Sequence, residues 1–251
     1  MPTEQPPHSA PPGPITSLDD PRAIQILSTE HWSQLSARSL AYNEAFVRGG
    51  MFLTFLSMSF VALALLAQGM SFGEEFLTVA AIVLAFDLVV GLTTYARISG
   101  ANVDDLRALH GMARIRHGYV EVAPILEPYF TSPTYDDVDS VLQSYGKLPE
   151  GGIGQLLYAL STSGGMIGMI VSMVGGVLAG VLALMVLSAD LAVWIGLLGA
   201  IVTFAGIALF TFGAVPSQQD RMVVRFPAPG SALAAATKDA VPTPEDRRRG
   251  L

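Results

Sequence analysis

Residues 165–213 read GMIGMIVSMVGGVLAGVLALMVLSADLAVWIGLLGAIVTFAGIALFTFG, two apolar runs of 23 residues around the short segment 188–190. A run of about 20 residues in an α-helix crosses a hydrocarbon core of about 30 Å. In lipid the backbone groups must be paired within the segment, which favours a helix over an open strand. The stretch therefore predicts a hairpin of two membrane-spanning helices, over 165–187 and 191–213.

A second pair of apolar runs lies nearer the N-terminus, over 49–68 and 76–95, each 20 residues long. All 16 prolines of the chain lie outside the four runs, so nothing in them predicts a kinked or broken span. Such runs are too long and too uniformly apolar for the buried helices of a soluble core. The sequence therefore predicts an all-α polytopic membrane protein, in which four transmembrane helices form two hairpins beside a small cytoplasmic helical layer.

The composition agrees with a membrane protein and excludes several other classes. Of 251 residues, 51% are hydrophobic and 14% are charged, and the mean hydropathy is +0.49. An ordinary soluble domain has about a quarter of its residues charged. The net charge of −7 disfavours nucleic acid as a partner, because phosphate binding requires a basic face. The absence of cysteine excludes disulfides, thiolate catalysis and cysteine-based metal sites.

The basic residues are distributed unevenly among the segments between the spans. The short segments 69–75 and 188–190 contain no Lys or Arg, and all 14 basic residues fall in the other segments. In membrane proteins the cytoplasmic segments carry the excess of Lys and Arg. We therefore expect a multi-pass protein of the cell (plasma) membrane with its N-terminus and C-terminus in the cytoplasm.

The spans divide the chain into segments of different composition. Proline-rich ends with few apolar residues are typical of disordered tails, whereas apolar residues at helical spacing predict short helices between the hairpins. In order, we expect a disordered tail over 1–19, a cytoplasmic or interfacial helix over 20–48, the first transmembrane hairpin over 49–95, a cytoplasmic helical segment over 96–164, the second hairpin over 165–213 and a mostly disordered cytoplasmic tail over 214–251.

The segment before the first span contains signals for the start of a helix. Asp20 can cap a helix whose first residue is Pro21, and Thr29 can begin a second helix that continues into the span. We expect this region to lie on the membrane surface or against the cytoplasmic helices.

Asp87 is the charged residue that lies inside a predicted span, near the middle of 76–95. A carboxylate at that depth costs roughly a few kcal/mol, so it is protonated, faces the bundle interior, or binds an ion or proton. The structural alternative is a neutral acid hydrogen-bonded to Thr54, Ser57 or Ser59 of the first span. Asp87 is therefore the intramembrane candidate site, with both interpretations open.

The third span carries small residues at every fourth position. They are Gly164, Gly168, Ser172, Gly176 and Gly180. A helix face without large side chains lets another helix approach closely, and such packing drives helix association in lipid. The partner can be the fourth span, which has small residues at the same spacing, or another subunit; those of the fourth span are Ala192, Gly196 and Ala200.

A polar cluster follows the second span, and its basic members suggest contact with anionic lipid headgroups. These are Arg114, Arg116 and His117. His117 and Glu121 form one pair at i, i+4, which supplies too few ligands for a metal site. The sequence has no phosphate-binding loop and no recognisable catalytic triad or carboxylate pair. We therefore expect no enzyme activity, no metal site and no cofactor.

Two long phrases, ILSTEHWSQLSARSLAYNEAF at 26–46 and RIRHGYVEVAPILEPYFTSPTYDD at 114–137, resemble a family of bacterial multi-spanning integral membrane proteins of uncharacterised function. The resemblance covers about residues 24–145 and implies a membrane location without implying an activity. An entry helix followed by a two-span hairpin and cytoplasmic helices is also similar, more loosely, to the two-span effector domains of bacterial conflict systems. That similarity implies perforation of a membrane on a signal from a sensor.

Two functions from different classes follow from these patterns. The first is a non-enzymatic helix-bundle scaffold or interaction protein that oligomerises through the third span and presents its cytoplasmic layer to a partner protein. The alternative is a small channel, or an ion- or proton-coupled transporter, that uses Asp87. The expected partners are the lipid bilayer and further copies of the chain.

Overall fold

The computed structural model describes residues 15–70, 72–145, 152–219 and 223–230, and these ranges contain helices and no strand. Four helices are long and apolar enough to cross a membrane, which confirms the predicted all-α polytopic fold. They are α1 (Pro21–Met70), α2 (Glu74–Val122), α5 (Ser163–Leu184) and α6 (Ala189–Gln219).

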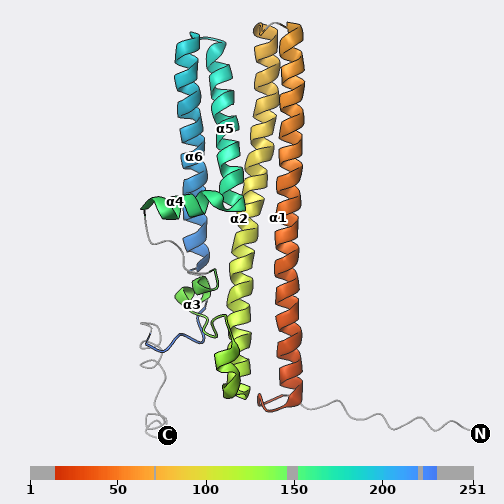
Figure 1. The fold of residues 1–251 in the computed structure, drawn as a ribbon, viewed down its shortest axis with the longest axis vertical. Coiled ribbons are helices and arrows are strands. Elements are labelled where there is room, and N and C mark those ends of the chain that lie inside the picture. The colour runs from red at the N-terminus through yellow and green to blue at the C-terminus, as the bar shows by residue number, and fades with distance from the viewer. Residues whose placement is uncertain (1–14, 71, 146–151, 220–222, 231–251) are drawn as a thin grey trace, which may run out of the picture.

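The four long helices form two antiparallel hairpins that lie side by side (Figure 1). α1 packs against α2, α2 against α5, and α5 against α6, so α2 and α5 are the inner helices of the row. α5 and α6 accompany mainly the apolar halves of α1 and α2 (Figure 1). The other halves, residues 21–48 and 96–122, project as a helical pair that we call the stalk. At a rise of 1.5 Å per residue the stalk is about 40 Å long.

α1 begins where the sequence predicts and continues without a break. Asp20 Oδ1 accepts a hydrogen bond from the backbone N–H of Arg22 at 2.9 Å, which caps a helix that starts at Pro21. The second start expected at Thr29 is absent, because this hydroxyl donates to a carbonyl four residues earlier, at 2.8 Å, inside the same helix. Residues 21–48 therefore continue directly into the span and pack against α2 as one arm of the stalk.

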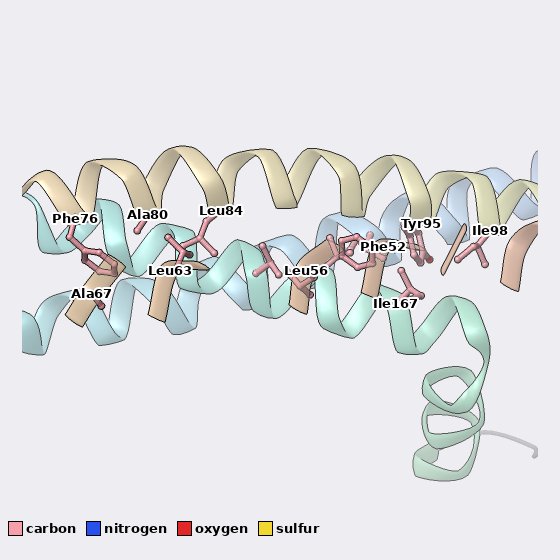
Figure 2. Packing of buried hydrophobic residues seen from close by; sticks show 13 residues of the cluster. Phe52, Leu56, Leu63, Ala67, Phe76, Ala80, Leu84, Tyr95, Ile98 and Ile167 are labelled. Carbon is pink, nitrogen blue, oxygen red and sulfur yellow. The ribbon is translucent and has the colours of Figure 1, made fainter. Parts of the chain in front are cut away.

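The apolar core lies between α1, α2 and α5 (Figure 2). Gly91 of α2 lies where side chains of both α1 and α5 meet the backbone of α2. A Cβ atom at Gly91 would lie 2.7 Å from Val171 Cγ2 of α5 and 3.0 Å from Phe52 Cζ of α1. A side chain here would force Val171 or the helices to shift, so glycine permits the close contact. Other buried members of this cluster are Leu56, Leu63, Ala67, Phe76, Ala80, Leu84, Tyr95, Ile98, Ile167, Val174 and Ile207.

Short elements lie along the side of the stalk, from its middle to its far end (Figure 1). η1 (Pro124–Tyr129) follows α2, and α3 (Val138–Gln143) begins after Asp137, whose carboxylate accepts the backbone N–H of the third helical residue at 3.1 Å. Residues 223–230 return beyond α6 and lie against the same region. We call residues 123–145 together with 223–230 the basal layer.

α4 (Gly152–Ser161) lies across the foot of α5 (Figure 1). Its apolar side chains Ile153 and Leu157 are exposed. α5 then begins after Thr162, whose hydroxyl oxygen accepts the backbone N–H of Gly165 at 3.1 Å. The chain therefore changes direction sharply between α4 and α5 with a regular cap at the new helix start.

The segment expected to be a mostly disordered tail, 214–251, contains ordered structure. α6 continues to Gln219, and residues 223–230 are held by hydrogen bonds to Asp136 and Asp137. Of the other residues predicted to be disordered, 15–19 are described and include hydrogen bonds between Ser17 and Asp19, whereas 1–14, 220–222 and 231–251 lie outside the described residues.

Candidate functional site

Asp87 lies in the middle of the apolar half of α2 and is 0% exposed. The hydroxyl of Ser59 on α1 donates to Asp87 Oδ1 at 2.9 Å, whereas Oδ2 has no hydrogen-bond partner among the described residues. Thr54 and Ser57, the other two expected donors, instead donate to carbonyls of their own helix four residues earlier. The carboxyl group therefore joins α2 to α1 through one hydrogen bond.

The small residues of α5 pack within the chain. A Cβ atom at Gly176 would lie 2.7 Å from both Ala200 Cβ and the carbonyl oxygen of Gly196 on α6. At Gly180 it would lie 3.4 Å from the carbonyl oxygen of Ala192. The structure therefore places the fourth span, one of the two expected partners, against this face.

The other end of the same ladder turns toward α2. A Cβ atom at Gly168 would lie 3.1 Å from Tyr95 Cε2, and one at Gly164 would lie 3.7 Å from Asn102 Nδ2. Ser172, between the two ends, is buried and donates to the carbonyl of Gly168 at 2.7 Å. The ladder thus lets α5 contact both of its neighbours.

Sequence reasoning missed a second line of close contacts between α5 and α6. A Cβ atom at Gly175 would lie 2.4 Å from Thr203 Oγ1, and one at Gly199 would lie 2.5 Å from Ala179 Cβ. This line also has four-residue spacing, over 175 and 179 on α5 and over 199 and 203 on α6, so a search for small residues one position before the first ladder would have found it.

A buried carboxylate joins the two helices of the stalk. Asp105 of α2 accepts hydrogen bonds from the Arg38 guanidinium and, at 3.0 Å, from the Tyr42 hydroxyl, both on α1. The Tyr145 hydroxyl donates to the same carboxylate at 2.5 Å. Burial raises the pKa of Tyr145, and its hydrogen bond to Asp105 raises it further. These groups hold α1, α2 and the end of the basal layer together.

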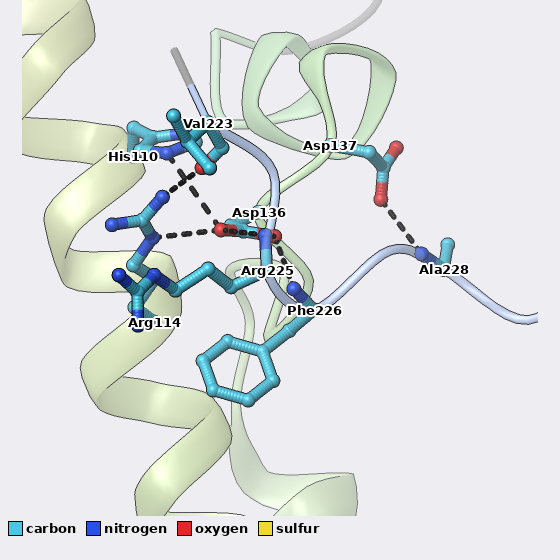
Figure 3. A network of polar contacts seen from close by, with 8 residues as sticks. All are labelled: His110, Arg114, Asp136, Asp137, Val223, Arg225, Phe226 and Ala228. Atoms are coloured by element: carbon cyan, nitrogen blue, oxygen red, sulfur yellow. Dashed lines mark hydrogen bonds and ion pairs between the residues drawn. The ribbon is translucent and has the colours of Figure 1, made fainter. Parts of the chain in front are cut away.

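A second buried carboxylate, Asp136, holds residues 223–230 against α2 (Figure 3). Its oxygens accept the backbone N–H of Arg225 at 3.0 and 3.1 Å, the N–H of Phe226 at 2.7 Å and Nε of Arg114 at 2.7 Å. Asp137 accepts the N–H of Ala228 at 2.9 Å. We call this set of contacts the latch.

The charges around the latch explain its protonation. Burial alone would raise the pKa of Asp136, but the Arg225 N–H and the Arg114 guanidinium outweigh burial and bring this pKa below its ordinary value. His110 Nε2 lies 3.7 Å from Asp136 Oδ2. Burial, followed by the charge of Arg114, lowers the pKa of His110 despite the carboxylate beside it. The latch therefore combines an ionised Asp136 with a neutral His110 at pH 7.

The three residues assigned to lipid headgroups contact protein in the structure. Arg114 is bound to Asp136, Arg116 donates to the carbonyl of Pro133 at 3.4 Å, and the His117 ring stacks on Phe226 with centroids 4.2 Å apart. Arg114 follows Tyr95, the last residue of the predicted span, by 19 residues, which is about 28 Å along a helix. These three side chains therefore lie on the stalk, in contact with the basal layer.

No family model matches this chain, and no curated protein and no solved structure matches it either. The sites therefore have to be interpreted from their own chemistry.

The buried carboxylates of Asp105, on the stalk, and of Asp136, in the basal layer, have the environment of structural groups. Both oxygens of Asp105 and both oxygens of Asp136 accept hydrogen bonds from protein donors. Within the described ranges no group of three or more His, Asp or Glu residues is arranged to hold a metal ion. A carboxylate whose two oxygens both accept hydrogen bonds from the protein holds the donating elements together.

Proposed function

We propose that this chain is a multi-pass protein of the cell membrane that acts as a non-enzymatic scaffold. Four spans anchor it, and the stalk holds the basal layer at a fixed height for a partner protein on the cytoplasmic side. The proposal replaces self-association through α5, because α6 and α2 of the same chain occupy the ladder face.

The observation that carries the proposal is the rigid connection between the spans and the basal layer. α1 and α2 leave the apolar halves as unbroken helices. Near the apolar half, Glu44 of α1 accepts hydrogen bonds from Arg97 of α2 at 3.0 and 3.1 Å; farther along the stalk, Asp105 binds Arg38. A pair of helices that is cross-linked at two places holds the basal layer at a more constant distance from the spans than a flexible linker would.

The distribution of charge supports a cytoplasmic basal layer. Every Lys or Arg in the described ranges lies in the stalk or the basal layer: Arg22, Arg38, Arg48, Arg97, Arg107, Arg114, Arg116 and Arg225. The turns at the opposite end contain none. By the positive-inside rule, the stalk faces the cytoplasm.

The tip of the stalk offers a surface for a partner. On η1, Ile125 is 79% exposed and Tyr129 is 78% exposed, although both are large and apolar or aromatic. Exposed groups of this kind are enriched at the centres of protein interfaces. We therefore place the partner-binding surface of the scaffold at η1.

Photo-cross-linking in living cells tests the scaffold. A photoreactive phenylalanine analogue in place of Tyr129 is expected to give protein adducts of discrete mass above 26.5 kDa. The same analogue in place of Leu198, which is exposed on the apolar part of α6, is the matched control and is expected to give none. The absence of protein adducts at Tyr129 would contradict the scaffold.

A second candidate function, a channel or proton-coupled transporter, rests on the unpartnered Oδ2 of Asp87. Asp87→Asn keeps the size of the side chain and removes its titration. Under this candidate, ion or proton flux through liposomes containing the purified protein falls in the variant. Equal flux in both proteins, or none in either, would exclude it.

A further inference from the structure

One side of the stalk exposes apolar residues although it lies beyond the apolar half of α1. Trp32 is 66% exposed, Leu40 is 72% exposed and Phe46 is 66% exposed. α1 is the edge helix of the row in Figure 1, and α2 packs against its other side. Apolar groups gathered in this way on a surface that water reaches mark an interaction site.

The residues along this side recur at the spacing of a coiled coil. They are Trp32, Ser36, Ser39, Asn43, Phe46 and Gly50, all exposed, which follow one another at steps of four, three, four, three and four residues. An average step of 3.5 residues keeps the same side of a helix facing a parallel partner helix. We call these six residues the outer face of α1.

The charges of α1 in this region point away from the outer face. Arg38 and Glu44 pair with Asp105 and Arg97 of α2, and Arg48 pairs with Glu44 at 2.9 Å. The outer face therefore has no charged member along its length of about 27 Å.

The outer face also contains a hollow. It is lined by Trp32, Leu35, Ser36, Ser39, Leu40 and Asn43. Two small serines lie there between larger side chains, which is the arrangement of a hole that receives a knob from a facing helix.

We propose that a second copy of this chain covers the outer face of α1, in a parallel dimer whose two-fold axis is normal to the membrane. The inference rests on the proposed function, because it takes the stalk to stand outside the lipid. Two copies inserted in the same orientation have parallel stalks at the same height. Each residue of one outer face therefore lies opposite the same residue of the other copy. An uncharged face permits this contact, and Asn43 at a central position favours a parallel two-stranded arrangement.

The available area is sufficient for such a dimer. After Gly50, exposed residues continue on the same side of α1 through Leu53 and Ser57 to Ala64. From Trp32 to Ala64 is 33 residues, about 50 Å, and a helix is about 10–12 Å wide. Two copies therefore bury about 1,000–1,200 Å² in total, which reaches the lower range of specific interfaces.

Disulfide cross-linking of the full-length protein in its membrane tests the dimer. The chain has no cysteine, so Ser39→Cys introduces a single thiol on the outer face. Facing positions of this kind approach the Cα separation of a disulfide, about 4.4–6.8 Å. We expect mild oxidation to convert Ser39→Cys to a species of twice the chain mass of 26.5 kDa. Ser33→Cys, equally exposed but on a neighbouring side of α1, is the control and is expected to yield at least about tenfold less.

A second variant tests the chemistry of the contact. Asn43→Asp places like charges opposite each other across the two-fold axis, so it is expected to lower the cross-linked fraction of Ser39→Cys by at least about tenfold. Asn43 is exposed in the single chain, so the melting temperature of the monomer is expected to stay unchanged. Absence of a Ser39→Cys dimer, or equal cross-linking with and without Asn43→Asp, would overturn the proposal.

The outcomes separate this dimer from the scaffold function. Adducts of Tyr129 with another protein, together with a monomeric Ser39→Cys chain, overturn the dimer and leave the scaffold. A Ser39→Cys dimer without adducts at Tyr129 supports the dimer and overturns the scaffold.

Discussion

Among the buried aspartates of the described residues, Asp105, Asp136 and Asp87 differ in how completely their oxygens are hydrogen-bonded. Asp105 and Asp136 each accept hydrogen bonds at both oxygens, whereas Asp87 accepts one from Ser59 and leaves Oδ2 unpartnered within the described residues. A buried charge is stable only when it is compensated by donors. The first two carboxylates are therefore structural elements of the stalk and basal layer, and Asp87 is the one whose chemistry stays open.

Asp136→Asn is expected to release residues 223–230 from α2. The variant replaces charge-assisted hydrogen bonds to Arg225 and Phe226 by weaker ones and leaves Arg114 without its ion pair. We expect a loss of about 2 kcal/mol in the local stability of the latch, or roughly thirtyfold more of the open form. Limited trypsin digestion followed by mass spectrometry measures this as faster cleavage after Arg225.

The neighbouring Asp139→Asn variant is the matched control for the latch. It removes the same charge from an exposed carboxylate of the same segment. Cleavage after Arg225 is expected to stay at its original rate. Equal acceleration by Asp136→Asn and Asp139→Asn would show that general charge, and not the latch, protects this bond.

The basal layer is expected to lose stability as the pH falls below about 6.5. The folded state lowers the pKa of His110 through burial and Arg114, so the unfolded chain binds more protons in the window below the ordinary histidine value. Stability therefore rises with pH through that window. His31 has its pKa lowered by burial as well, and it contributes in the same direction.

His110→Gln tests this pH dependence. We expect the fall in melting temperature from pH 7.5 to 5.5 to be smaller in the variant than in the original protein. A larger fall in the variant would mean that attraction between protonated His110 and Asp136, 3.7 Å apart, outweighs burial.

At the scale of elements, the contact between α5 and α6 depends on missing side chains. Gly176→Leu would insert a side chain where even a Cβ atom lies 2.7 Å from the backbone of Gly196. We expect a loss of about 1–3 kcal/mol, measured as a lower melting temperature in detergent, with unchanged oligomeric mass. Gly206→Leu on α6 is the control, because a Cβ atom there meets nothing within 4 Å. Equal melting of the two variants would contradict the close contact.

The sequence predicts the long helices well because their signals are local. An apolar run and the Asp20 cap are each read within one segment, and lipid requires a helix whatever the rest of the chain does. The choice of Ser59 over Thr54 and Ser57 as the partner of Asp87 depends on which side of α1 faces α2. The partner of Asp87 can therefore be identified only from the packing of α1 against α2.

The polar sites of the stalk could not be predicted because their members lie far apart in the chain. Arg38 and Asp105 are 67 residues apart, and Asp136 and Arg225 are 89 residues apart. No spacing rule joins such residues. The composition of residues 214–251 likewise indicated a tail, because the bonds that order 223–230 are supplied by another part of the chain.

At the scale of the whole molecule, the proposed orientation in the membrane rests on the one-sided distribution of Lys and Arg. The chain has no cysteine, so single thiols report their side directly. Ala189→Cys, in the turn before α6, is expected to react with an impermeant thiol reagent in intact cells. Glu127→Cys, exposed on η1, is expected to react only after the cells are permeabilised. The reverse labelling pattern would contradict a cytoplasmic basal layer.

The latch also sets the order of events during synthesis of the protein. Asp136 is made 89 residues before Arg225, and α5 and α6 lie between them in the chain. At a translation rate of about 5–20 residues per second, the carboxylate waits roughly 5–20 s for its partner. The latch closes only after the second hairpin has been made and the chain has returned to the side of the stalk. Closure of the latch therefore requires that α5 and α6 have already been made, so a chain that stalls before Val223 keeps Asp136 without its main-chain donors and has an unfinished basal layer.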